Sequence, residues 1–244
     1  MFNGGFMENW VNDVEYVLMP SRYPIKDYEA KYFAAYEVWK KAWSKFRGEI
    51  GINETLSSDG FLLPHEMGVL FYKGECVGFS AFTHGTLTEG PLPDHSWWKA
   101  WSPEAFQKLK SISDNAIICS QFTVNPEFAG KGHIVRWKEI VFLYTFMRFE
   151  HSHAGVMAGH LNLTRGMQNA CGETFGATVL NPCHPFSYYG VEINAQLVAY
   201  ERENIRLMQE RRGVVSLCSD LWTKLTHLTE FPAHSNVIPF KNVA

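Results

Sequence analysis

The segment from Asn125 to Ile134, which reads NPEFAGKGHI, carries residues of a type and spacing that suit anion binding. It follows a β-like run ending at Val124 and precedes an apolar helical run from His133 to Phe149. A strand, a short glycine-rich loop and a helix start present free backbone N–H groups, and the helix dipole adds partial positive charge. We therefore predict a pyrophosphate site here, and hence a cofactor that carries a nucleotide.

The spacing of Gly130 and Gly132 separates this loop from two common phosphate-binding loops. A P-loop places a Lys-Ser/Thr pair after its last glycine, and the dinucleotide fingerprint needs three glycines in the pattern G-x-G-x-x-G. Neither pattern is present. An ordinary turn between a strand and a helix would also contain such glycines, so the flanking residues decide between the two interpretations.

The run VNPEFAGKG resembles the motif between strand 4 and helix 3 of the GNAT superfamily of acyl-CoA N-acyltransferases, V-x-P-x-x-R-G-x-G-x-G/A. Ala129 stands where the family usually has Arg or Gln, and Ile134 stands where it usually has Gly or Ala. The matching residues are the valine, the proline and both glycines: Val124, Pro126, Gly130 and Gly132.

The resemblance implies acetyl-CoA or another acyl-CoA as cofactor, and direct transfer of the acyl group from the thioester to an amine. It places the pantetheine arm along strand 118–124, where the backbone of Phe122 and Val124 would contact it. Because Ala129 and Ile134 depart from the motif, an acyl carrier protein stays open as donor, since its arm lacks the adenosine pyrophosphate. The pyrophosphate would lie on the backbone N–H groups of Gly130, Lys131, Gly132, His133 and Ile134.

Three polar residues are candidates for catalysis of such a transfer, which needs a general base near the thioester. His160 ends the next predicted strand and has a suitable unperturbed pKa, although it could simply bond to a loop carbonyl. Asn162 could hold the pantetheine or a water, or cap a helix. Gln121 lies on the first strand, where strict alternation places it on one face with Cys119 and Thr123.

The general acid expected from the resemblance is missing. Many family members carry a tyrosine on the helix that follows this strand, and the alignment of residues 173–176 puts Gly172 at that position. This absence, and the lack of a carboxylate on the strand, leave a second class open: a non-catalytic GNAT-like acyl-CoA-binding or sensor module. A hydrolase that uses Cys119 is a weaker option. His151, His153 and His160, together with their neighbours, match no known spacing of metal ligands, so no metal site is predicted.

The acceptor pocket is predicted on the side opposite the cofactor, from the long loop 84–104 and the strands near 183–190. Glu89, Asp94 and Glu104 could attract an ammonium group, and no Lys or Arg cluster lies nearby, so a highly anionic acceptor is disfavoured. We expect a small amine-bearing acceptor, such as an amino acid derivative. The substrate-binding candidates are Trp97, Trp98, Trp101 and Tyr188. These aromatic residues could instead only fill a core.

The elements that must position these residues predict a mixed α/β fold. Apolar residues at a spacing of three to four predict an amphipathic helix over 26–47. The other expected elements are a hairpin of strands 68–72 and 76–83, strand 116–124, helix 133–149, strand 153–160, helix 162–174 and two strands within 177–200. This order agrees with the resemblance, which implies a GNAT-like domain over 1–195 with a central mixed, mostly antiparallel sheet and splayed parallel strands. Residues 196–244 are expected to form a C-terminal helical extension that packs on the core or on a partner in a homodimer.

Composition limits the class of protein, its partners and its expected compartment. Of its 244 residues, 46% are hydrophobic and 19% are charged, which is typical of a globular chain. The net charge of −3 and the lack of a basic stripe argue against nucleic acid as a partner. No apolar run is long enough to predict a membrane span. Five cysteines without a C-x-x-C pair, and no secretory signal, indicate reduced thiols in the cytoplasm.

Overall fold

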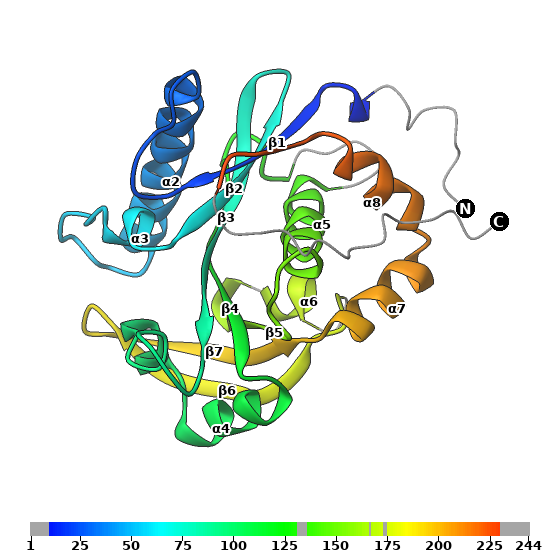
Figure 1. Ribbon diagram of the computed structural model, residues 1–244. Coiled ribbons are helices and arrows are strands. Elements are labelled where there is room, and N and C mark those ends of the chain that lie inside the picture. The colour runs from blue at the N-terminus through cyan, green and yellow to red at the C-terminus, as the bar shows by residue number, and fades with distance from the viewer. Residues whose placement is uncertain (1–9, 131–135, 166, 173–174, 230–244) are drawn as a thin grey trace.

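The computed structural model describes residues 10–130, 136–165, 167–172 and 175–229. Within these ranges, one eight-stranded sheet has the strand order β6-β7-β5-β4-β3-β2-β1-β8 (Figure 1). The β4–β5 and β1–β8 pairs are parallel and the other neighbours are antiparallel. This confirms the predicted mixed, mostly antiparallel sheet. The strands are β1 Val14–Pro20, β2 Glu66–Tyr72, β3 Glu75–Thr86, β4 Asn115–Val124, β5 Val156–Asn162, β6 Thr178–Tyr188, β7 Val191–Tyr200 and β8 Leu225–His227.

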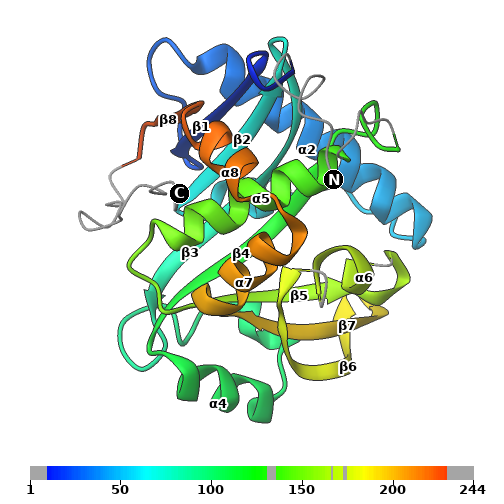
Figure 2. The same cartoon turned by 90° about the vertical axis from the view of Figure 1, so that its right-hand side faces the viewer.

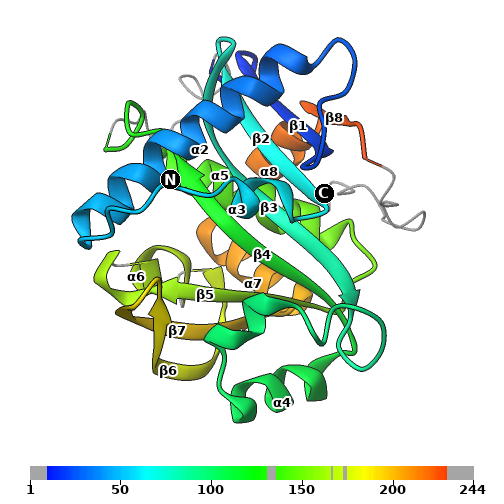
Figure 3. The ribbon, with the colours of Figure 1, turned by 90° about the vertical axis from the view of Figure 1, so that its left-hand side faces the viewer.

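Helices cover both faces of this sheet. Helices α2 (Glu29–Glu49) and α3 (Asp59–Leu62) lie on one face, together with α4 (Pro103–Ile112) at the far end of the sheet (Figure 3). The other face carries α5 (Trp137–Glu150), α7 (Arg202–Arg212) and α8 (Val215–Trp222) (Figure 2). The short elements η1 (Ser96–Ala100), η2 (Leu163–Arg165) and α6 (Met167–Cys171) belong to the connections.

The central helix of the second face, α5, is buried on nearly all sides, because it lies between the sheet and the helices α7 and α8. Its apolar residues form the largest core cluster together with the side chains of β1, β5 and α8. A helix that is hydrophobic around its whole circumference is expected in such a position. Among the described residues, no helix combines the length and the apolar character needed to cross a membrane.

Helix α2 confirms the predicted amphipathic helix and presents one stripe to the sheet. Tyr32, Ala35, Trp39 and Arg47 are its buried residues, at the spacing that one helix face requires. The stripe therefore ends in a buried guanidinium near the helix C-terminus. The apolar part of the stripe packs against β1, β2 and β3 in a separate core cluster.

Several element boundaries differ from the sequence-based expectation. The helix expected to begin at His133 begins at Trp137, and residues 131–135 lie outside the described ranges. The strand expected at 153–160 runs from Val156 to Asn162. The helix expected over 162–174 is divided into η2 and α6, because Asn162 starts a tight turn. The boundary placed at residue 195 falls inside β7.

Candidate active site

The two parallel strands in the middle of the sheet, β4 and β5, separate after a short paired stretch. Their pairing is limited to Ala116–Val156, Ile117–Met157 and Ile118–Ala158. Beyond this point β5 stays paired with β7 and β4 stays paired with β3. The divergence is visible in Figure 3, where β4 runs away from β5 at a steep angle. An edge of β4 is thus left without its strand partner, next to the predicted cofactor loop.

A β-bulge at Gln121 accompanies this divergence. Gln121 has a left-handed φ of 52°, and the register between β3 and β4 shifts between Phe79 and Ala81. An extra residue in one strand breaks the alternation of side chains. Cys119 and Phe122 consequently pack on the α5 face, whereas Gln121 bonds to a residue of α2 on the opposite face. The expectation that Cys119 and Gln121 share a face is wrong, because it assumed a regular strand.

We call the point at which β4 and β5 diverge the splay. The C-terminal half of α2 contacts residues on both sides of it. On the β4 side, the indole Nε1 of Trp39 donates to Gln121 Oε1 at 2.9 Å, and Nε1 of Trp43 donates to Thr123 Oγ1 at 3.1 Å. Beyond the end of β5, Arg165 forms an ion pair of 2.7 Å with Glu49 near the end of the same helix. Figure 3 shows this end of α2 on the side of β5 and α6.

Aromatic residues from the β6–β7 hairpin face the same end of α2. The ring of Tyr188 lies 6.3 Å from that of Phe46, measured between centroids, and Tyr188 contacts Tyr189 at 4.8 Å. Burial, followed by the neighbouring Tyr189, raises the pKa of Tyr188, so its phenol is neutral at physiological pH. The guanidinium of Arg47 lies 4.2 Å from the centre of the Tyr189 ring.

His160 lies on β5, two residues after Ala158, the last residue of this strand that pairs with β4. Its ring stacks between Trp97, at 4.8 Å and 13°, and Phe186, at 5.5 Å and 30°. This burial lowers the pKa of His160 to about 4, so the imidazole is neutral at physiological pH. Its Nδ1 is buried and has no hydrogen-bond partner among the described residues, loop carbonyls included. A neutral ring with a free nitrogen can accept or relay a proton, although only as a weak base.

The tryptophans of η1 divide into two groups. Trp97 is half-buried and reaches His160. Trp98 donates from its indole to Leu92 O at 2.7 Å, and both Trp98 and Trp101 are buried in the cluster that includes α4. Of the three, only Trp97 contacts a predicted catalytic residue in the described part of the chain.

Asn162 caps the turn that follows β5. Its Oδ1 accepts hydrogen bonds from Thr164 N at 2.9 Å and from Thr164 Oγ1 at 2.6 Å. This geometry fits the capping role that the sequence left open for it, since short polar side chains satisfy free N–H groups at helix starts.

The described part of the cofactor loop is held by Asn125. Asn125 Nδ2 donates to Cys76 O at 2.9 Å, and its Oδ1 accepts from Glu127 N at 3.0 Å. Phe122 stacks on Phe142 of α5 at 4.1 Å, and Val124 pairs with Gly78 of β3. Gly130 has a left-handed φ of 72°. The predicted pyrophosphate contacts Lys131, Gly132, His133 and Ile134 lie outside the described residues.

Two further positions bear on the chemistry. A Cβ at Gly172 would lie 2.4 Å from the backbone oxygen of Gln168, so the position expected for a tyrosine has no room for a side chain. Burial raises the pKa of Cys119 to about 12 despite its hydrogen bond with Ser80, which leaves the thiol protonated. A protonated thiol is a poor nucleophile, and this argues against the Cys119 hydrolase.

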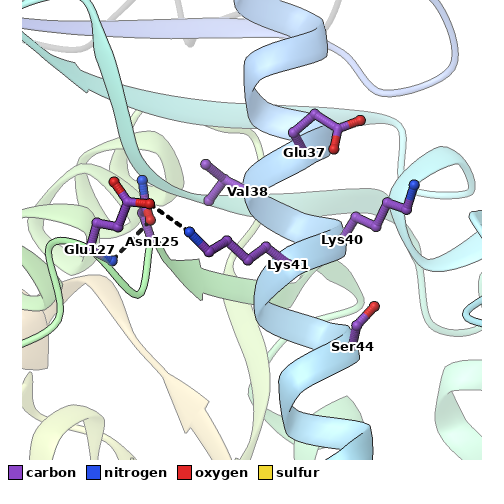
Figure 4. Close-up of a pocket in the computed structure, with 7 residues that line it drawn as sticks. All are labelled: Glu37, Val38, Lys40, Lys41, Ser44, Asn125 and Glu127. Carbon is purple, nitrogen blue, oxygen red and sulfur yellow. Dashed lines mark hydrogen bonds and ion pairs between the residues drawn. The ribbon is translucent and has the colours of Figure 1, made fainter. Parts of the chain in front are cut away.

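An open hollow of about 530 Å³ lies between α2 and the start of the cofactor loop. Lys41 points across it to Glu127, with an ion pair of 2.5 Å, while Lys40 points away (Figure 4). Sequence reasoning did not identify this hollow, because it joins segments far apart in the chain. The described residues contain no cluster of three potential metal ligands. The hollow is lined by Glu37, Val38, Lys40, Lys41, Ser44, Asn125 and Glu127.

Comparisons with known proteins identify this architecture. No protein-family model matches the chain, and no curated protein sequence does. Among solved structures, the N-acyl amino acid synthase FeeM from uncultured soil microbes superposes with a TM-score of 0.54 at 11% identity, over 82% of this chain and 97% of that chain. The CoA-dependent acyl-homoserine lactone synthase BjaI, with SAM and isopentyl-CoA, gives a TM-score of 0.53 at 10% identity, over 88% and 94% of the two chains. The chain therefore has the GNAT fold that its motif at Val124–Gly132 predicted.

Proposed function

We propose that this protein is an acyltransferase that moves an acyl group from a CoA thioester to the amine of a small acceptor. The splay of β4 and β5 is the observation that carries the proposal. It leaves the backbone of β4 beyond Ile118 free to bond to an extended pantetheine arm, at the end of the strand that leads into the predicted pyrophosphate loop. The two structurally similar synthases with TM-scores above 0.5 support the same chemistry.

In this proposal the protein mainly positions the two substrates and contributes few reactive side chains of its own. A thioester is already activated, so the protein must orient the amine, remove one proton and stabilise the oxyanion. Backbone N–H groups near Phe122 and Val124 would stabilise the oxyanion. The acceptor would approach from the α2 face, where Gln121 and His160 lie, because α5 and its aromatic neighbours fill the opposite face. His160 would take the proton from the attacking amine through its free Nδ1. As the amide C–N bond forms, the thioester C–S bond breaks, and CoA leaves as a thiolate that can receive this proton from His160.

The donor can be tested directly. Calorimetric titration with acetyl-CoA, with longer acyl-CoAs and with a charged acyl carrier protein would rank the possible donors. We expect saturable binding of at least one of them, and substitution of Phe122 by Arg should weaken it, because a charged side chain would disturb the stack on Phe142 at the splay. Absence of binding to every donor would refute the proposal.

A second function, that of a non-catalytic acyl-CoA-binding module, is favoured by one observation. The position of the usual general acid is a glycine whose surroundings exclude a side chain. Release of free thiol, measured across a panel of amines and amino acids, separates the two functions. Turnover with any acceptor supports the transferase, whereas tight donor binding without turnover supports the module.

A further inference from the structure

Arg47, the last residue of the buried stripe of α2, has an unusual environment. Its side chain is 2% exposed. Nη1 donates a hydrogen bond to Thr55 O at 3.4 Å, but Nε and Nη2 have no hydrogen-bond partner among the described residues. Burying a guanidinium without hydrogen bonds is costly, and such groups are normally paired. The fold thus holds a cation for which it supplies no complete set of acceptors.

The free edge of this guanidinium is the one suited to a carboxylate. Nε–H and the adjacent Nη2–H point to the same side and form a planar fork that binds two carboxylate oxygens at once. Glu54 is the acidic residue beside it, at 3.8 Å from Nη2, which is beyond hydrogen-bond distance. The Glu54 side chain is 71% exposed, so it is free to move away from the fork.

Arg47 lies one helical turn beyond the tryptophans of α2 that contact β4 at the splay. Trp39 and Trp43 precede it by eight and four residues on one helix face, and both bond to β4 beyond the last residue paired with β5. On its other side, Arg47 stacks on Tyr189 at the tip of the β6–β7 hairpin. The guanidinium therefore lies between the helix and the hairpin, on the face from which the acceptor would approach.

We propose that Arg47 binds the carboxylate of the acceptor, which makes the acceptor an amino acid rather than a simple amine. This inference rests on the proposed function and names its substrate class. One guanidinium matches one carboxylate, which agrees with the expectation that a highly anionic acceptor is disfavoured. Arg47 is a binding residue in this scheme: it fixes one end of the acceptor and leaves the amine to reach the thioester.

Equilibrium binding of matched products tests the inference without any need for turnover. The probes are N-lauroyl conjugates of leucine, phenylalanine and serine, each compared by calorimetry with the conjugate of the corresponding decarboxylated amine. For at least one pair, we expect the carboxylate member to bind about tenfold more tightly or better, as for hydrogen bonds to charged groups. Arg47→Met should abolish this preference, and Arg47→Lys should restore only part of it, because an ammonium lacks the fork.

The control is Lys45→Gln, which removes a positive charge from the exposed side of the same helix and should keep the preference. Urea unfolding without ligand distinguishes binding from a structural role. A binding arginine that lacks partners predicts that Arg47→Met is as stable as the wild type or more stable. No preference in any pair, or a preference that survives Arg47→Met, would overturn the inference, while thiol release tests the transferase itself independently.

Discussion

The indole of Trp39 donates a 2.9 Å hydrogen bond to the side-chain oxygen of Gln121, and Gln121 is the left-handed residue of the bulge in β4. The Gln121 side chain is also enclosed by α3, since a Cβ on Gly60 would lie 3.0 Å from Gln121 Nε2. Helices α2 and α3 therefore hold the residue at which β4 departs from a regular strand. The shape of the splay and the position of the α2 stripe depend on each other through this contact.

Replacement of Gln121 by valine tests how much the bulge depends on its conformation. A β-branched residue is strongly disfavoured at a φ of 52°, and the Trp39 indole would lose its acceptor. We expect Gln121→Val to lower the free energy of unfolding by about 1–3 kcal/mol in urea titrations. Gln121→Gly loses the same hydrogen bond without the strain and should cost less. Equal stability of the two variants would show that the backbone strain is unimportant.

The buried His160 predicts a pH dependence of stability. Burial lowers the pKa of its folded form to about 4, below the unfolded value near 6.5. As pH falls below about 6.5, the unfolded chain binds a proton that the folded chain does not, so stability decreases until about pH 4. We expect His160→Phe to lose less stability than the wild type between about pH 7.5 and pH 5 in urea unfolding. Parallel losses in both proteins would contradict this assignment.

Gly172 should tolerate no side chain. Its would-be Cβ meets the backbone oxygen of Gln168 at 2.4 Å, which a rotamer change cannot relieve. We expect Gly172→Ala to reduce the unfolding free energy by about 1–3 kcal/mol, as overpacking does. Gly48→Ala is the matched control, because its Cβ position in helix α2 has no neighbouring atom within 4 Å apart from the adjacent residues and backbone of its own helix, and it should stabilise by about 0.5–1 kcal/mol. A stable Gly172→Tyr variant would reopen the question of the missing acid.

The cysteines should differ in their reaction with iodoacetamide. Cys183 is exposed, whereas burial raises the pKa of Cys119 to about 12. We expect peptide mass spectrometry to find alkylated Cys183 and unmodified Cys119 after treatment at about pH 7.5, since the thiolate is the reactive form. Acyl transfer should survive the treatment. Loss of transfer together with modification of Cys119 would favour a cysteine nucleophile instead.

The sequence predicted the fold through local signals and missed what depends on distant contacts. The motif around Gly130 and the hairpin at 73–75 are continuous in sequence, so they led to the mixed sheet and its parallel splay. Strand β1 was missed because it is buried on both faces and lacks alternation. Helix α7 lies within the helical extension expected over 196–244, but its own bounds were not predicted, because its sequence, RENIRLMQERR, is mostly polar and only Ile205 and Gln209 are buried.

The candidate site was likewise predictable where it depends on local sequence and not where it depends on contacts between distant segments. His160 was identified from its place at the end of a strand, but its stack between Trp97 and Phe186 joins three separate segments. The left-handed conformation of Gln121 has no sequence signature, since glutamine is not a typical residue for it. Arg47 resembled an ordinary charged residue at the end of a helix. A spacing signal was nevertheless present, because Trp39, Trp43 and Arg47 recur at intervals of four residues.

The pairing of β8 with β1 has a consequence for the order of folding. Tyr16 and Leu225, from opposite ends of the described chain, are neighbours in a parallel ladder, and Tyr144 of α5 donates to Leu221 O just before it. Contacts between such distant residues require a large loop to close, which slows their formation. We therefore expect the outer edge of the sheet to form late, after the hairpin of β2 and β3 and the β6–β7 hairpin. Until then β1 carries an open edge, and the partly folded chain is exposed to intermolecular strand pairing.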